Sequence, residues 1–158
     1  MEIADRPQPP TGAARLLFRA PVHLYRWGLG PLLGGRFLLL NHVGRTSGRR
    51  RRTVLEVVDR TPGGAYVVCS GFGPRADWYR NVLAHPRVLV QVGARRFAAE
   101  AEPPAADEGA GFFVGYARRH PRAAVRLARM MGFVLDGSEE DFRAAGRELP
   151  FVRLHPRA

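Results

Sequence analysis

The sequence predicts an α+β domain built around a small antiparallel β-barrel, closed or half-closed, with helices at both ends of the chain. Three observations support this fold class. Five short apolar or alternating segments lie between residues 37 and 102, and turns rich in glycine and proline separate them. Too little helix lies between these segments for parallel crossovers. The 158 residues, 46% of them hydrophobic, suffice for one packed core.

The N-terminal part divides into a tail and a helical segment. Residues 1–11 are rich in proline and predict a flexible tail, so that a single domain spans residues 12–158. Residues 12–27 place Leu17 and Leu24 on one helical face, with arginines on the opposite face. This pattern predicts either a surface helix packed on the core or a basic amphipathic helix resting on anionic lipid.

Three strands are expected next, at residues 37–43, 53–59 and 65–70, because each is a short run rich in apolar or β-branched residues. Residues 61–64 read Thr-Pro-Gly-Gly, which is a strong turn signal between the last two strands. These two strands therefore predict a β-hairpin.

A short helix and two further strands follow. Asp77 can cap a helix over residues 78–84, which a His-Pro pair ends. Residues 88–92 predict a strand, and residues 95–102 alternate in polarity, as expected of a strand with one face buried. Together with the preceding strands, these two complete the set from which the barrel is built.

The C-terminal part is expected to be mainly helical. Residues 106–119 and 122–131 have helical patterns, and a His-Pro pair separates them. Ser138 is expected to cap a third, shorter helix that runs through Arg147, with Asp141 at the third helical position. Residues 151–154 predict one last strand.

The charge of the chain points to an anionic partner. All 25 basic residues are arginines, and with 14 acidic residues they give a formal net charge of +11. Part of this bias is typical of GC-rich genomes. The absence of lysine excludes a Schiff-base mechanism, and arginine suits bidentate contacts with phosphate or carboxylate. The partners to consider are a phosphorylated cofactor, nucleic acid and an acidic membrane surface.

Metal sites and disulfides are not expected. Cys69 is the single cysteine and lies in an apolar run, which favours a buried, unreactive thiol. The five histidines show no metal-ligand spacing and are interpreted as structural or solvent-facing. The chain begins without a signal-peptide pattern, and no apolar run approaches about 20 residues. We therefore expect a cytoplasmic location, with membrane contact through residues 12–27 left open.

The segment from residue 42 to 53 is the most informative for function. Two glycines, Gly44 and Gly48, bracket an Arg-Thr-Ser sequence between two expected strands, and four arginines follow. Glycines let the backbone turn tightly, so that N–H groups and the hydroxyl groups of Thr46 and Ser47 can face an anion. The pattern favours a phosphate cradle. A solvated run of charge and a nucleic-acid patch are the alternatives.

A second segment, residues 70–81, combines a glycine-rich loop with the start of a helix. Such a loop allows a flat ring to approach the backbone closely, and Trp78 and Asn81 lie one helical turn apart on one face. Trp78 is interpreted either as a partner for that ring or as an anchor of the hydrophobic core. Asn81, near an apolar face, needs hydrogen-bond partners.

The two segments, in this order and spacing, resemble the deazaflavin-dependent nitroreductase family. The resemblance covers about residues 16–104 and rests on Gly-Arg-Thr-Ser-Gly, the Arg-Thr that follows the arginine run, and Asp-Trp-Tyr-Arg-Asn. It implies a split β-barrel related to the flavin-mononucleotide-binding reductases, flanked here by an N-terminal helix and C-terminal helices.

The resemblance also implies a cofactor and an activity. Family members bind coenzyme F-420, an 8-hydroxy-5-deazaflavin with an anionic phospholactyl-polyglutamate tail. The reduced cofactor then delivers a hydride to a quinone, a nitroaromatic or a similar activated acceptor. Flavin mononucleotide (FMN), haem or a lipid are alternative ligands of related split barrels. A nucleic-acid-binding module is disfavoured because the aromatic residues do not alternate with arginines. A homodimer is left open.

The site residues implied by the resemblance fall into two groups. The phosphate-binding motif matches Arg45, Ser47 and Arg52, and Arg51 is the alternative to Arg52 because one residue is added to the arginine run. The expected cofactor contacts are Arg45, Thr46, Ser47, Gly48, Arg51, Arg52, Ser70, Gly71, Trp78 and Asn81. Tyr79, Tyr116 or water is expected to supply the proton that the reduced product needs.

Overall fold

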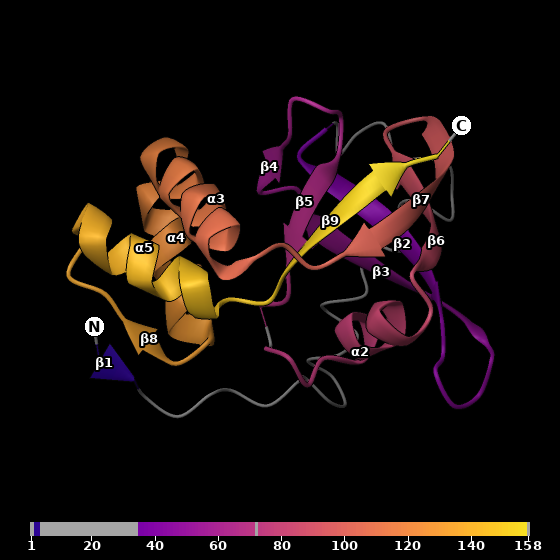
Figure 1. The fold of residues 1–158 in the computed structure, drawn as a ribbon, viewed down its shortest axis with the longest axis horizontal. Coiled ribbons are helices and arrows are strands. Elements are labelled where there is room, and N and C mark those ends of the chain that lie inside the picture. The colour runs from indigo at the N-terminus through magenta and orange to yellow at the C-terminus, as the bar shows by residue number, and fades with distance from the viewer. Residues whose placement is uncertain (1, 4–34, 72, 158) are drawn as a thin grey trace.

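A curled antiparallel sheet and a layer of helices beside it form the fold (Figure 1). The computed structural model describes residues 2–3, 35–71 and 73–157. The strands of the large sheet are β2 Phe37–Val43, β3 Arg50–Glu56, β4 Asp59–Arg60, β5 Tyr66–Cys69, β6 Arg87–Val92, β7 Arg95–Glu102 and β9 Phe151–Pro156. The helices are α2 Asp77–Ala84, α3 Ala106–Arg119, α4 Pro121–Met130 and α5 Glu139–Glu148.

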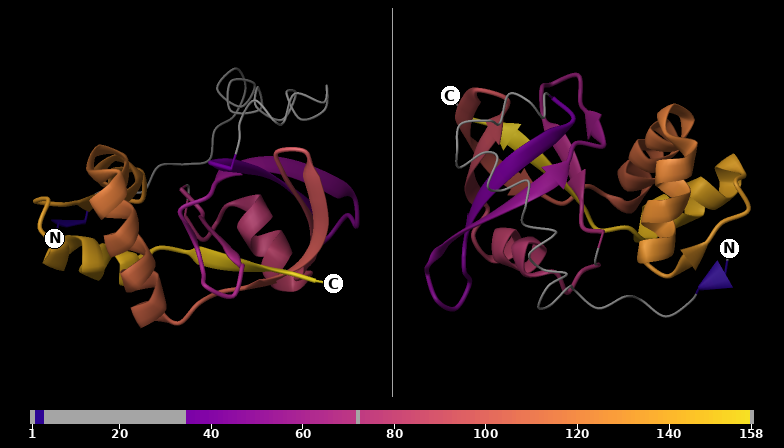
Figure 2. Two further views of the ribbon diagram at one scale, coloured as in Figure 1. Left: turned by 90° about the horizontal axis from the view of Figure 1, so that it is seen from above. Right: turned by 180° about the vertical axis from the view of Figure 1, so that it is seen from behind.

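The seven strands follow the order β3-β2-β6-β7-β9-β5-β4, and every neighbouring pair is antiparallel. The sheet curls into a half-barrel, and α2 lies within its curve, as the view from above shows (Figure 2). The helices α3, α4 and α5 lie to one side of this barrel. The predicted split-barrel fold is thus confirmed for the described residues.

Alternation along the strands builds the barrel core. In β2, Leu38 and Leu40 point inward, and Leu38 pairs with Leu55 of β3 on the same face. The helix α2 adds Trp78 and Val82 to this core, so it closes one end of the barrel. Burying aliphatic and aromatic side chains of this size contributes about 1.5–3 kcal/mol each. The sheet and α2 are therefore held together by one shared apolar core.

A second core lies between the helices and the sheet. Phe113 of α3 stacks on Tyr116 and meets the rings of Phe142 and Phe151. Phe151 starts β9, so the last strand carries this aromatic cluster into the sheet. The bond from the Tyr116 hydroxyl to Glu56 of β3, at 3.0 Å, adds a polar link between the two layers.

The strands agree with the sequence predictions except at the arginine run. The strand expected at 53–59 is found at Arg50–Glu56, because β3 pairs residue for residue with β2 from Val43 onward. Its first half therefore consists of arginines. The hairpin predicted around residues 61–64 does form, but β4 supplies its first strand, and β3 pairs with β2 instead.

The helices were well predicted from the sequence. The observed α3 matches the expected range, and α4 and α5 differ by about one residue. The Ser138 cap is confirmed, since the backbone N–H of Asp141 donates to the Ser138 hydroxyl at 3.2 Å. The expected Asp77 cap is wrong. Ala76 is the N-cap residue, and no side chain bonds to the start of α2, because the Asp77 carboxylate faces Arg45 instead.

The N-terminal predictions fall almost wholly outside the described residues. The helix over 12–27 lies there entirely, and so does most of the tail over 1–11. At residues Glu2–Ile3 the structure has a short strand, β1, where the sequence predicts flexible tail. It pairs with β8, Phe133–Val134, after α4.

The contact between α3 and α5 predicts an asymmetric effect of adding single methyl groups. A Cβ at Gly146 would lie 2.8 Å from the Ala110 Cα and 2.8 Å from the Phe113 Cβ, whereas a Cβ at Gly111 meets nothing within 4 Å. Gly146→Ala should lower the free energy of unfolding by about 1–3 kcal/mol through overpacking. Gly111→Ala should raise it by up to about 1 kcal/mol through helix propensity.

Urea unfolding of both variants measures the difference. Equal stability of Gly146→Ala and the unmodified protein would show that the two helices can separate without cost.

Candidate functional site

The loop between β2 and β3 is compact and rests on two glycines. The Gly44 N–H donates to the Arg49 carbonyl at 2.8 Å, and the Gly48 N–H donates to the Gly44 carbonyl at 2.9 Å. Gly48 has a φ of 67°, in the left-handed region that favours glycine. At Gly44 a Cβ would overlap the Ser47 hydroxyl, which would have to turn away from the Arg49 N–H that it accepts. The backbone conformation therefore favours glycine at position 48, and the packing of Ser47 favours it at position 44.

Asn81 of α2 ties this loop to the helix. Its Oδ1 accepts the backbone N–H of Arg45 at 3.1 Å and the Nη1 of the same residue at 2.8 Å. The Nη1 and Nη2 groups of Arg45 both lie 3.4 Å from the Asp77 Oδ1. The Asn81 side chain is enclosed, with the residue 2% exposed. Asn81 therefore orients Arg45, and its own side chain exposes little surface to a ligand.

His42 completes the network from the barrel side. Because the two Arg45 donors fix the Asn81 oxygen, the Asn81 Nδ2 group faces the His42 Nδ1 at 3.1 Å, and this nitrogen must accept. Burial, helped by the nearby Arg51 and opposed by the charge of Asp77, lowers the pKa of His42 to about 4. The ring is therefore neutral near pH 7 and can act as the acceptor.

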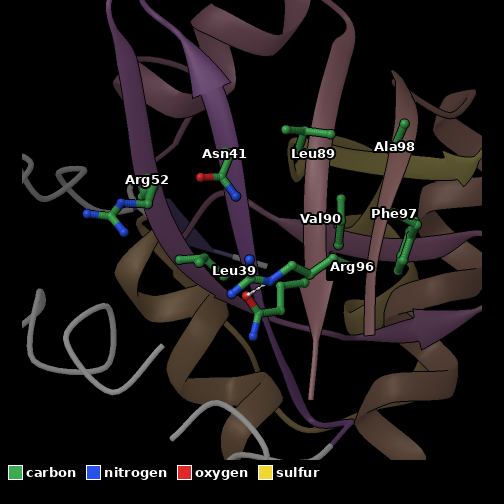
Figure 3. Close-up of a pocket in the computed structure, with 9 residues that line it drawn as sticks. Leu39, Asn41, Arg52, Leu89, Val90, Arg96, Phe97 and Ala98 are labelled. Atoms are coloured by element: carbon green, nitrogen blue, oxygen red, sulfur yellow. Dashed lines mark hydrogen bonds between the residues drawn. The ribbon is translucent and has the colours of Figure 1, made fainter. Parts of the chain in front are cut away.

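The arginine run divides between the two faces of β3. Arg51 pairs with His42, so its side chain lies on the same face as the network. Its Nε lies 3.6 Å from the position that a Cβ of Gly44 would take. Arg52 pairs with Asn41 and lies on the outer face of the sheet (Figure 3). The structure thus places Arg51 next to the glycine loop that carries Arg45, and Arg52 on the opposite face of the strand.

The loop offers a set of hydrogen-bond donors toward solvent. Thr46, Ser47 and Gly48 are exposed, and within the described residues the N–H groups of Thr46 and Ser47 have no hydrogen-bond partner. With the guanidinium groups of Arg45 and Arg51, these donors surround one corner of the molecule. Asp77 is the carboxylate that contacts this corner, through Arg45. Such a donor set suits a phosphate or a carboxylate.

The remaining predicted site residues, Ser70, Gly71 and Trp78, lie in the loop before α2 and in α2 itself. Ser70 is 0% exposed, and its hydroxyl donates to the Gly73 carbonyl at 2.7 Å, so it shapes the loop that leads to α2. Trp78 is 9% exposed and belongs to the barrel core. Gly71 is partly exposed and lies beside the ends of Leu127 and Met130 of α4. Of these three, Gly71 offers the most surface to a ring.

Neither tyrosine predicted as a proton donor lies at the loop. The Tyr116 hydroxyl donates to Glu56, five residues along β3 from Arg51 and hence about 17 Å away. Burial and the Glu56 carboxylate raise the pKa of Tyr116. Tyr79 lines a hollow of about 160 Å³ against α3 and α5, and burial raises its pKa too.

Sequence reasoning missed two members of the network. His42 was assigned a generic structural role and Asp77 a helix cap, yet both contact residues that hold the loop. The alternation of β2, which places Leu38, Leu40 and His42 on one face, was the available signal for His42. No sequence signal links Asp77 to Arg45.

Residues 35–71 and 73–157 contain neither a candidate metal site nor a candidate membrane span. These residues contain no group of three histidine, cysteine or acidic side chains that could hold a metal ion. None of the helices described there is both long enough and apolar enough to cross a membrane. Cys69, predicted to be buried, is partly buried, and burial raises the pKa of its thiol.

Comparison with known proteins identifies similar sequences and folds. The model of the F-420H(2)-dependent quinone reductase family matches residues 17–131, more than half of the chain. No curated protein sequence matches significantly.

Solved structures resemble the fold at low sequence identity. An F-420-H2 dependent reductase, FDR-A, has a TM-score of 0.54 at 20% identity, over 76% of this chain and 94% of its own. A pyridoxamine 5'-phosphate oxidase-related, FMN-binding protein from Nostoc punctiforme has a TM-score of 0.54 at 13% identity, over 92% and 81%. A third protein, described as a domain-swapped dimer, has a TM-score of 0.54 at 19% identity, over 86% and 100%.

The buried His42 predicts a loss of stability in acid. The unfolded chain binds a proton at His42 below pH 6.5, whereas the folded chain does so only near pH 4. The free energy of unfolding should therefore fall as the pH drops from 6.5 to 4, by up to about 3 kcal/mol from this residue.

Denaturant unfolding across this range tests the effect. His42→Gln keeps an acceptor but cannot titrate, so its stability should depend less on pH. His85→Gln, a change at an exposed histidine, should keep the full dependence. Parallel pH profiles for all three proteins would contradict a neutral, buried His42.

Proposed function

Because this chain belongs to the F-420H(2)-dependent quinone reductase family, we propose that it transfers a hydride from reduced coenzyme F-420 to a quinone, a nitroaromatic or a similarly activated acceptor. Coenzyme F-420 is the cofactor of this family. The observation that carries the proposal is the convergence of Arg45 and Arg51 on a glycine-bracketed loop with open N–H donors.

The residues present fit the anionic end of this cofactor. The corner of the loop is made of guanidinium, amide and hydroxyl donors, which match the oxygens of a phosphate and of the carboxylates that follow it in the tail. Arg45 and Arg51 would bind the phosphate, and Thr46, Ser47 and Gly48 would surround it. When bound, the reduced deazaflavin supplies the hydride.

The remaining site residues would hold Arg45 and the ring of the cofactor in position. Asn81 and His42 hold Arg45 in place from beneath, so that little side-chain entropy is lost when the anion binds. Ser70 and Trp78 would support the ring region from within the fold, while the partly exposed Gly71 would offer its backbone to the ring on the side away from Leu127 and Met130. Because Tyr116 is engaged by Glu56 and Tyr79 faces α3 and α5, water is the proton source that we favour.

FMN is the second candidate cofactor. Its phosphate would use the same donors, and the Nostoc punctiforme protein of similar fold is FMN-binding. Absorbance and fluorescence titrations of the purified chain with F-420 and with FMN decide between the two. A homodimer and a membrane contact through residues 12–27 remain predictions, which sedimentation and vesicle flotation can test.

The division of the arginines between two faces predicts which of them bind the cofactor. Arg45→Ala and Arg51→Ala should each weaken F-420 binding by about 1.5–3 kcal/mol, because each removes a charge-assisted hydrogen bond to the phosphate. Arg52→Ala removes the same charge one residue away and should have little effect. Titration of F-420 fluorescence gives the three affinities.

The opposite pattern, with Arg52 important and Arg51 not, would move the phosphate site to the outer face of β3. Unchanged affinity in all three variants would remove the loop from the cofactor site altogether.

The burial of Trp78 predicts that its loss affects folding more than binding. Trp78→Ala should lower the free energy of unfolding by about 3–5 kcal/mol, because it leaves a cavity in the barrel core. Trp78→Phe, which keeps an aromatic ring, should lose less. Thermal melts with and without F-420 report both effects. A variant of normal stability that no longer binds F-420 would show instead that Trp78 contacts the ring.

A further inference from the structure

The outer face of the sheet carries an ordered pattern of side chains opposite the barrel core. The strand registers align Arg52, Asn41, Leu89 and Ala98 in one row across β3, β2, β6 and β7. The neighbouring row contains Leu39, Gln91 and Arg96. Figure 3 shows the first row from Arg52 at one side to Ala98 at the other. We call this surface the outer-face groove: Leu39, Asn41, Arg52, Leu89, Arg96 and Ala98.

The outer-face groove is hollowed on both sides of Leu89. One hollow, of about 420 Å³, includes Leu39 and Arg96, and the other, of about 440 Å³, includes Arg50 and Arg87. Asn41, Leu89 and Ala98 line both. Each volume is in the range of small-molecule sites, about 300–1,000 Å³. Leu89 is 55% exposed, an unusual position for a large aliphatic side chain in the middle of a sheet.

Unpaired arginines surround this apolar floor. Within the described residues, Arg50 and Arg52 form no ion pair with a carboxylate, and Arg96 donates to the Gln91 amide at 3.1 Å. Arg87 lies opposite Glu100 of β7, whose carboxylate pairs with Arg157. Arg50 and Arg52 lie on one face of β3, two residues and hence about 7 Å apart. The positive charge is therefore concentrated next to the exposed leucine.

We propose that the outer-face groove is a second binding site, separate from the loop at residues 44–48, for a small amphipathic anion. The anion has a phosphate or carboxylate head and an apolar body. Arg50 and Arg52 bind the head as charge-assisted hydrogen-bond donors. Leu89 and Ala98 contact the body, which covers the exposed leucine and removes its apolar surface from water.

The chemistry of the face selects this occupant over two others. The backbone groups of β2 and β6 are used within the sheet, so the face cannot add a peptide strand and offers side chains alone. A second copy of the chain on a two-fold axis would place the arginines of one face against those of the other, which is electrostatically unfavourable. A free anion neutralises them instead.

Binding of octyl phosphate to the full-length protein tests the proposal, with inorganic phosphate and 1-octanol as probes of head and body alone. Amide shifts in an NMR titration locate the site. We expect octyl phosphate to bind more tightly than either partial probe, with shifts on β2, β3 and β6. Leu89→Gln and Arg52→Gln should each weaken it by about tenfold or more.

Matched controls are available elsewhere on the surface. Leu83 of α2 is also exposed, and Arg122 of α4 is an exposed arginine, so Leu83→Gln and Arg122→Gln should bind octyl phosphate as the unmodified protein does. Ala98→Glu, which adds a negative charge to the groove while Leu89, Arg50 and Arg52 stay in place, should also weaken binding. If Leu89→Gln fails to fold, Ala98→Glu still tests whether the groove binds octyl phosphate.

Three outcomes would overturn the proposal. Equal affinity for phosphate and octyl phosphate would leave the apolar floor without a role. Shifts confined to residues 44–48 would place the anion at the loop. Sedimentation that shows a dimer in the unmodified protein and a monomer in Leu89→Gln would assign the face to a second copy of the chain.

Discussion

The hydrogen bonds from Arg45 to Asn81 are the constraint on which the proposed cofactor site depends. They join two segments that are 36 residues apart in sequence, the loop after β2 and the helix α2. The Asn81 amide can hold Arg45 only if its other end has an acceptor, and His42 provides it from inside the barrel. Burial keeps that histidine neutral. An arginine at the surface is thus oriented by a chain of neutral groups anchored in the core.

Side chains alternate between the two faces of β3, and this alternation separates its arginines. Successive arginines of this strand alternate between the two faces, so one sequence run supplies two different positively charged surfaces. Arg51 joins the loop and the buried network, whereas Arg50 and Arg52 join the apolar outer face. A single run of charge in the sequence therefore contributes to two proposed sites with different chemistry: donors around a compact loop, and donors beside a hydrophobic floor.

Local patterns predicted most of the fold because the physical signals are local. The helix at α3 and its neighbours follow from apolar periodicity, and the Ser138 cap follows from a side chain that reaches a backbone N–H three residues on. The start of β3 could not be predicted in this way, because arginines have little preference for strands. Their conformation comes from pairing with β2 through the glycine loop. Likewise, nothing in residues 151–154 indicates that β9 lies between β7 and β5.

The sequence alone determined the class of fold, the family resemblance, and the two segments that build the proposed site, since each depends on residue types at short spacing. The tertiary structure decided which side chains of those segments meet. It placed Arg51 rather than Arg52 on the face of the glycine loop, enclosed Asn81 and Trp78, and separated Tyr116 from the loop. The physical reason is that strand register and burial depend on partners distant in sequence, which spacing along one chain segment cannot specify.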